Sequence, residues 1–212
     1  MSLKNIIFDL GGVLLDIDYN KTVEAFGNLG IPDPERAFSK AHQARVFRAY
    51  EKGEITTRSF LDHLGKSVPG RTESELTKAW CALLGPMKPD KFRILEQLSN
   101  SHRLFVLSNT NEIHRSVFEA HIEKAYGMSK FSALFEEIHY SHQMGMRKPD
   151  VEIFEAVVST HGIAPSETLF IDDTEVHVEG ARKSGMRAEH LSDTKTLVEI
   201  LQSAGVLSTT RY

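Results

Sequence analysis

The chain has 212 residues, enough for one sizeable domain or for a core domain with a small insertion. It is 41% hydrophobic and 25% charged, and its formal net charge of −4 gives no electrostatic reason to expect nucleic acid or an anionic membrane as partner. Cys81 is the one cysteine, which excludes an internal disulfide and fits a reducing compartment.

The N-terminal residues run directly into a strand pattern, without the charged, apolar and small-residue regions of a signal peptide. No apolar run approaches the ~20 residues that a membrane helix needs. We therefore expect a cytoplasmic protein that acts away from membranes. The sequence gives no indication of its oligomeric state.

Short apolar runs that stop abruptly at small or acidic residues predict the strands. They lie at residues 6–8, 104–107, 134–138 and 169–171. Continuous runs of this length, without alternation of apolar and polar residues, are typical of strands buried on both faces of a parallel sheet. Between them, apolar residues recur at helical spacing, as at 113–122, 153–158 and 176–186. Alternating strands and helices predict a doubly wound α/β, Rossmann-like core with a parallel sheet.

The segment from about residue 19 to residue 87 breaks this rhythm, because it holds helix-like stretches and no convincing buried strand. We interpret it as an α-helical cap inserted after the first strand. The predicted domains are a catalytic core of residues 1–17 and 88–212 and a helical cap of residues 18–87. Residues 208–212 read as an unstructured tail.

Residues with chemical potential follow the predicted strands, at the edge where active sites of open α/β sheets form. Asp9 follows the first strand, Ser108 the second, and Lys148 lies in the loop after the third. Asp172 and Asp173 follow the fourth. Such a set suits phosphoryl transfer, because a phosphate repels an attacking carboxylate until a lysine and a divalent cation neutralise the charge. Ligands that are all oxygen favour Mg²⁺.

Each of these signals is weak alone, since aspartate and serine at strand ends are usually turn or cap residues. Their conjunction in order, each after a predicted strand, resembles the haloacid dehalogenase superfamily, whose helical cap also stands where the insertion lies. Within it, the chain is similar to bacterial α-glucose-1-phosphate phosphatases. The shared features are the Phe-Asp-Leu-Gly start, the Ser-Asn-Thr-Asn segment, Gly-Met-Arg-Lys-Pro, and residues 51–55 of the cap.

The resemblance implies a role for each matched residue. Asp9 is the nucleophile that forms an aspartyl-phosphate, and Lys148 bridges it to the phosphoryl group. Ser108 and Asn109 bind that group. The implied metal site holds Mg²⁺ through Asp9, the backbone carbonyl of Gly11, Asp173, and Asp172 as a ligand or a neighbour of the ligands. The implied function is a magnesium-dependent phosphatase acting on a small phosphorylated metabolite, favouring a sugar phosphate such as a sugar 1-phosphate.

Two positions depart from the family pattern. Gly11 stands where most of its phosphatases have a second aspartate, the general acid and base, a role usually worth ~10²–10⁴-fold in rate. Asp16 and Asp18 lie nearby, but the sequence places neither at the leaving oxygen. His177 replaces the usual acidic or amide residue, and we expect it to face a neighbouring helix rather than the metal.

Two other functions stay open. A metal-free 2-haloacid dehalogenase uses a nucleophilic aspartate and a lysine, but its pattern lacks the Asp172-Asp173 pair. The loss of an acid at Gly11 could instead mark a phosphate-binding regulatory protein with little activity. Substrate choice is expected to depend on the cap, where polar residues near the closing loop are candidates: His42, Arg45, Arg48 and Glu51.

Overall fold

The computed structural model describes residues 2–37 and 44–207. Its main sheet has five strands, all parallel, in the order β5-β4-β1-β6-β7. The strands are β1 (Asn5–Phe8), β4 (Arg103–Ser108), β5 (Glu137–Tyr140), β6 (Thr168–Asp172) and β7 (Arg187–His190). Because β1 lies at the centre, with Phe8 in register with Val106 of β4 and Ile171 of β6, the residues that follow these strands meet at one edge. This confirms the predicted parallel α/β core.

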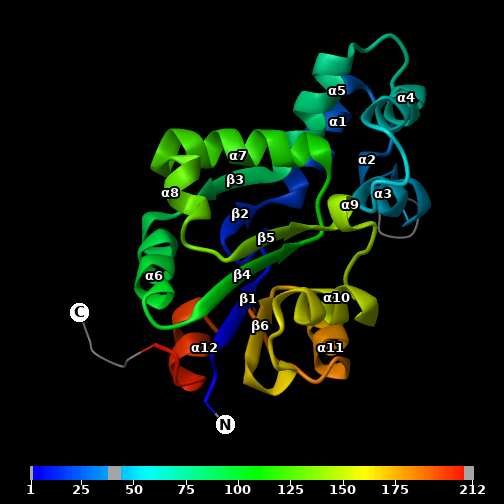
Figure 1. Ribbon diagram of the computed structural model, residues 1–212. Coiled ribbons are helices and arrows are strands. Elements are labelled where there is room, and N and C mark those ends of the chain that lie inside the picture. Colours follow the sequence, from blue (N-terminus) through cyan, green and yellow to red (C-terminus); the bar gives the residue numbers. More distant parts are fainter. Residues whose placement is uncertain (1, 38–43, 208–212) are drawn as a thin grey trace.

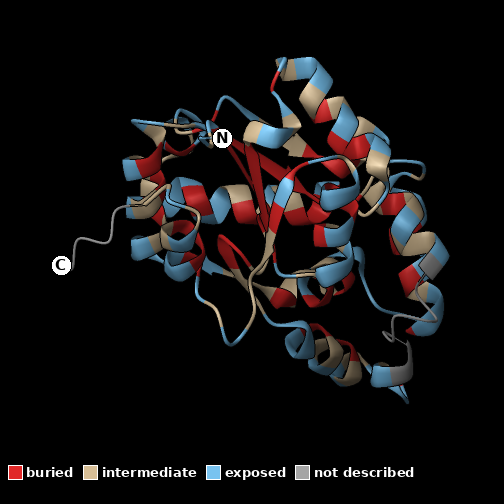
Figure 2. Cartoon of the chain, turned by 90° about the horizontal axis from the view of Figure 1, so that it is seen from below, coloured by how far each residue is buried: buried red, intermediate tan, exposed pale blue. Residues whose placement is uncertain are grey.

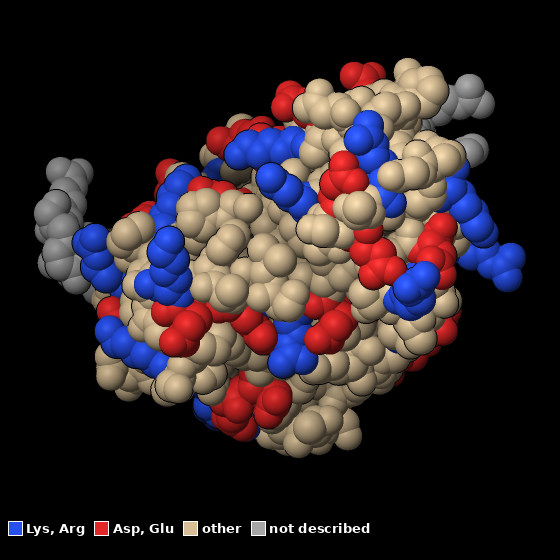
Figure 3. All heavy atoms as spheres, turned by 90° about the horizontal axis from the view of Figure 1, so that it is seen from above, with Lys and Arg blue, Asp and Glu red and all other residues tan. Residues whose placement is uncertain are grey.

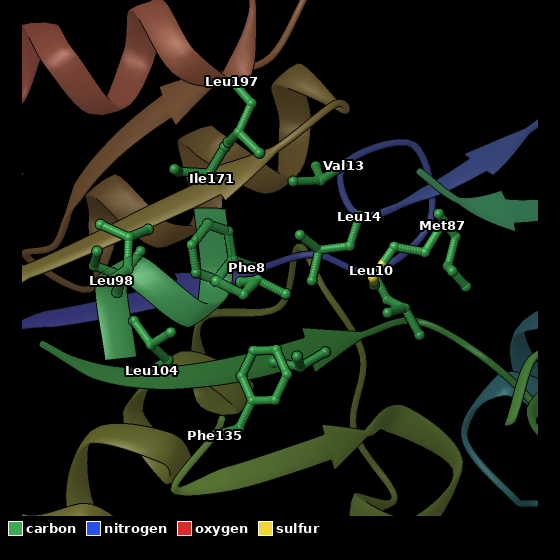
Figure 4. Packing of buried hydrophobic residues seen from close by; sticks show 14 of the residues in the cluster. Phe8, Leu10, Val13, Leu14, Met87, Leu98, Leu104, Phe135, Ile171 and Leu197 are labelled. Atoms are coloured by element: carbon green, nitrogen blue, oxygen red, sulfur yellow. The ribbon is translucent and has the colours of Figure 1, made fainter. Parts of the chain in front are cut away.

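Side chains alternate between the two faces of the sheet, and both faces are buried. Phe8 and Leu104 belong to one hydrophobic cluster, and Ile7 and Phe105 to another. The first face packs against α6 (Pro89–Ser99), α7 (Glu112–Tyr126), α8 (Met128–Ser132) and α12 (Leu197–Ser203). Figure 4 shows Leu98 of α6 and Leu197 of α12 among the residues of this cluster. The second packs against α10 (Val151–His161) and α11 (Glu175–Lys183). Figure 2 shows buried residues along the sheet and on the helix faces turned toward it.

The helices α1 (Tyr19–Leu29), α2 (Pro34–Ala37), α3 (Ala44–Glu51), α4 (Thr57–Ser67) and α5 (Glu73–Trp80) lie together beside one end of the core (Figure 1). Of these helices, α1, α3, α4 and α5 share a third hydrophobic cluster, in which Phe60 stacks on Tyr50 with ring centroids 4.2 Å apart. Ile113 of α7 joins the same cluster, so this helical group is packed against the core. The 3₁₀ turn η1 (Cys81–Leu83) follows it.

The prediction of a wholly helical insertion is wrong at its end. β3 (Leu84–Met87) pairs antiparallel with β2 (Leu15–Ile17), so the two connections between core and helices form a small two-stranded sheet. The pattern missed β3 because Gly85 and Pro86 are poor strand formers, and β3 exists through its pairing with a distant segment. Residues 208–212, predicted as a tail, lie outside the described residues. Among the described helices, none is long and apolar enough to cross a membrane.

Candidate active site

A buried lysine between two aspartates is the centre of the site. The Nζ atom of Lys148 lies 2.9 Å from Oδ1 of Asp9 and 2.7 Å from Oδ2 of Asp172, and Lys148 and Asp172 are fully buried. Asp9 comes directly after β1 and Asp172 ends β6, so the neighbouring strands place the two carboxylates side by side. Lys148 reaches them from the loop between α9 (Ser141–Met144) and α10. The arrangement joins three of the sequence-predicted residues.

The pKa values of the two carboxylates shift in opposite directions, although both contact the ammonium group of Lys148. Burial raises the pKa of Asp9 to about 7, although Lys148 opposes the rise. At Asp172 burial acts in the same direction, but Lys148 and His177 outweigh it and hold its pKa well below the usual range. The two carboxylates in turn raise the pKa of Lys148 despite its burial. Positive charge added beside Asp9, as from a divalent cation, would favour its ionised, nucleophilic form.

Asp173 completes a set of three carboxylates. Asp9, Asp172 and Asp173 each offer an oxygen, and these oxygens lie within 4.8 Å of one another. Both oxygens of Asp172 already accept hydrogen bonds. Among the described residues, the side chain that donates to the exposed carboxylate of Asp173 is the Thr174 hydroxyl, at a long distance of 3.3 Å. Asp173 therefore has more free oxygen capacity than Asp172, whose carboxylate is occupied by Lys148, Thr174 and His177.

The loop after β1 approaches Asp173 closely. Gly12 has φ +78°, and a Cβ at this position would collide with the Asp173 carboxylate. A glycine is needed here for both reasons. Gly11 does not have a positive φ, and its backbone pairs with Leu15. Its carbonyl remains a predicted metal ligand.

The segment after β4 fixes the lysine loop. The side-chain oxygen of Asn109 accepts from the Lys148 backbone N–H at 2.9 Å, and its Nδ2 donates to the Lys148 carbonyl at 2.9 Å. The amide predicted to bind phosphate thus holds the backbone of the lysine. Ser108 is buried, and its hydroxyl has no hydrogen-bond partner among the described residues, which leaves it available for a phosphate oxygen. The N-terminus of α7 begins just beyond, and helix N-termini favour anions.

His177 does not simply face a neighbouring helix, as expected. Its Nδ1 lies 3.0 Å from Oδ1 and 3.1 Å from Oδ2 of Asp172. The side chain reaches back from the first turns of α11, while Thr174 N–H donates to the same carboxylate at 2.8 Å. His177 therefore holds Asp172 in place and lies one hydrogen bond away from the set of three carboxylates.

The helical group touches the lysine loop directly. Arg147, the residue before Lys148, donates from Nε to Oε2 of Glu51 at 3.0 Å, and its Nη2 lies 2.9 Å from the same oxygen. Both side chains are half-buried. Among the described cap residues named from the sequence, Glu51 contacts the core through this ion pair, and His42 lies outside the described residues. Arg147 is a site residue that sequence reasoning missed, since its partner is 96 positions away.

A cavity of about 550 Å³ opens beside Asp173. It is lined by Gly12, Asp16, Ile17, Asp173, His190, Leu191, Ser192 and Asp193. The face seen in Figure 3 carries interspersed basic and acidic side chains. Lys148 is the basic residue that contacts both Asp9 and Asp172 at this site.

Residues 3–185 match the haloacid dehalogenase-like hydrolase family, and the chain belongs to it. The D-ribitol-5-phosphate phosphatase of Bacteroides thetaiotaomicron is 33% identical over 180 residues, covering 83% of this chain and 86% of the relative. A sesquiterpene phosphatase of Aspergillus oryzae is 28% identical, covering 96% of this chain and 98% of the relative.

Solved structures of related proteins are similar to this chain over most of its length. A family enzyme of Bacteroides thetaiotaomicron, crystallised as wild type with magnesium and inorganic phosphate, has a TM-score of 0.83 and 30% identity. The match covers 94% of this chain and 99% of that one. A predicted family hydrolase of Porphyromonas gingivalis has a TM-score of 0.84 and 26% identity, covering 96% of this chain and 98% of the other. The predicted superfamily is thereby confirmed.

Proposed function

We propose that this protein is a magnesium-dependent phosphatase that hydrolyses a small phosphate monoester through an aspartyl-phosphate on Asp9. The observation that carries the proposal is the buried Lys148 held between Asp9 and Asp172, with Asp173 at the exposed rim. A phosphate entering from this rim would meet a nucleophile, a fixed cation and free carboxylate oxygens together.

The donor set suits the metal. Oxygen ligands from one or two carboxylates are what Mg²⁺ takes in proteins, and Asp9 and Asp173 offer them, with the Gly11 carbonyl as a third ligand. Bound there, the ion would neutralise the charge of the phosphoryl group. The related enzyme crystallised with magnesium and phosphate supports this assignment.

The protein's own residues would act in two stages. In the first, Asp9 attacks phosphorus while Lys148, the Ser108 hydroxyl and the amides at the start of α7 hold the phosphoryl oxygens. In the second, water cleaves the aspartyl-phosphate and restores Asp9. Asn109, Asp172 and His177 keep the lysine in place throughout, because their hydrogen bonds fix its backbone and its ammonium group.

We favour a sugar or sugar-alcohol phosphate as substrate. The name of one relative, a D-ribitol-5-phosphate phosphatase, and the resemblance to α-glucose-1-phosphate phosphatases support this class. Within this class we favour sugar 1-phosphates, because their anomeric oxygen leaves more readily than a primary alkyl oxygen. Their hydrolysis therefore depends least on the general acid that Gly11 replaces.

The test is phosphate release from a panel of sugar, nucleotide and acid phosphates with Mg²⁺, for the wild type and for Asp9→Asn. We expect Mg²⁺-dependent release that the variant abolishes, because an amide can neither attack phosphorus nor bind Mg²⁺ strongly. Release from Asp9→Asn at the wild-type rate would refute the mechanism. Halide release in excess chelator would favour a dehalogenase, and tight phosphate binding without turnover would favour a regulatory protein.

A further inference from the structure

A buried serine outside the set of site residues holds the connection between β4 and α7, residues 109–111. The Oγ atom of Ser141, the first residue of α9, accepts from the Thr110 N–H at 3.0 Å and donates to the Thr110 carbonyl at 3.1 Å. Ser141 is fully buried and Thr110 is 5% exposed, so the two hydrogen bonds are shielded from water. One side chain thus satisfies both polar groups of a buried backbone position.

The loss of the Ser141 hydroxyl would disturb this connection. The Thr110 N–H would become a buried donor without its acceptor, and such a group costs free energy unless the backbone shifts to find water or another partner. A shift at Thr110 would be passed to Ser108, two residues earlier, whose buried hydroxyl faces the phosphate in the proposed mechanism. It would also be passed to the first amides of α7, which begins two residues later.

The segment that carries Ser141 also carries the lysine of the site. Ser141 and Lys148 are seven positions apart, and the connection after β4 is bonded to both of them. Thr110 exchanges two hydrogen bonds with Ser141, and the Asn109 side chain exchanges two with the Lys148 backbone. The Ser108 hydroxyl and the Lys148 ammonium group are therefore held at a fixed spacing by hydrogen bonds on both sides of residue 109.

Ser141 is itself held in place by its neighbours. Tyr140, the residue before it, ends β5, is buried and lies in register with Ser108 of β4. On the other side of α9 the cap approaches closely, because a Cβ at Gly53 would collide with the His142 carbonyl. A side chain anchored by the sheet and by the cap can fix the backbone that it binds.

We propose that Ser141 is a positioning residue for phosphoryl transfer, a role that rests on the proposed phosphatase function. It does not touch the substrate. Through Thr110 it keeps the Ser108 hydroxyl and the amides at the start of α7 where they can donate to phosphoryl oxygens. The metal ligands should not depend on it, because Asp9 and Asp173 follow other strands, β1 and β6.

The experiment compares Ser141→Ala with the wild type and with Thr168→Val, a matched control. Thr168 is also fully buried, and its hydroxyl also has two partners: it donates to the Ala164 carbonyl at 2.8 Å and accepts from Asn5 Nδ2 at 3.2 Å. It begins β6, at the end of the sheet away from the site. Calorimetry gives the Kd of inorganic phosphate with saturating Mg²⁺ and the Kd of Mg²⁺ alone. Steady-state kinetics on the best substrate and the melting temperature complete the comparison.

We expect Ser141→Ala to raise the phosphate Kd by ~10-fold and to lower kcat/KM by ~10–10²-fold, as small displacements of binding groups do. The Mg²⁺ Kd should change by less than ~2-fold, and so should every binding and kinetic constant of Thr168→Val, although both variants should melt at a lower temperature than the wild type.

Three results would overturn the role of Ser141 while leaving the phosphatase function standing. They are an unchanged phosphate Kd in Ser141→Ala, an equal loss of phosphate binding in Thr168→Val, and an equal weakening of Mg²⁺ and phosphate binding in Ser141→Ala. Each would make the serine a general contributor to stability. A wild type that neither binds phosphate nor releases it from any substrate would instead overturn the phosphatase function itself.

Discussion

A buried histidine between the core and the helical cap makes stability depend on pH. His114 lies in the first turn of α7; its Nε2 donates to the Trp80 carbonyl at 3.1 Å, and its Nδ1 accepts from Nδ2 of Asn111 at 3.2 Å. The ring stacks on Trp80 with centroids 4.7 Å apart. The neutral ring, with its hydrogen on Nε2, satisfies all of these partners. This tautomer is inferred from the partners themselves. A second proton on Nδ1 would face the Asn111 amide, a donor.

The size of this change in the free energy of unfolding follows from the shift in the pKa of His114. Burial lowers the pKa of His114 from 6.5 to about 4, although the Trp80 carbonyl opposes the change. Between these values the unfolded chain binds the proton and the folded one does not, so stability is fully present above pH 6.5 and is lost as pH falls toward 4. The full difference is ~3 kcal/mol at 1.36 kcal/mol for each pH unit, and ~2 kcal/mol of it is lost between pH 7 and pH 5.

The assay is denaturant unfolding at pH 7 and pH 5 for the wild type and His114→Gln, which can still donate to the Trp80 carbonyl but does not titrate. Because other groups also titrate in this window, the measured quantity is the difference between the two proteins in their loss of stability. We expect the wild type to lose ~2 kcal/mol more than the variant. His121→Gln, at an exposed position of the same helix, should lose as much as the wild type. Equal losses for the wild type and His114→Gln would refute the reasoning.

Three further predictions test the site. Lys148→Met should lower kcat by ~10²–10³-fold, as removal of a fixed electrostatic group does, whereas a change in KM alone would make the lysine a mere binding residue. Asp173→Asn should raise the Mg²⁺ concentration for half activity by at least ~10-fold, and an unchanged metal titration would exclude it as a ligand. Glu51→Gln and Arg147→Gln, alone and together, should show a coupling of ~1 kcal/mol in the free energy of unfolding; additive effects would contradict their pairing.

Much of the site could be predicted because strand ends are local signals. Asp9, Ser108 and Asp172 each follow an apolar run, and parallel strands bring such ends to one edge whatever the details of packing. The predicted strands correspond to β1, β4, β5 and β6, although β5 begins a few residues later than its apolar run. β7 was missed because its residues, Arg-Ala-Glu-His, carry no strand pattern and pair only at the edge of a sheet that is already formed.

The sequence alone determined the family, the order of the elements and the residue types that phosphoryl transfer needs, because these are written in short apolar runs and in the residues that follow them. Only the tertiary structure decided what each polar group does. Asn109 holds a lysine 39 positions away, and His177 turns back to Asp172. Such assignments depend on which side chains meet across the fold, and hydrogen-bond partners distant in sequence leave no local pattern.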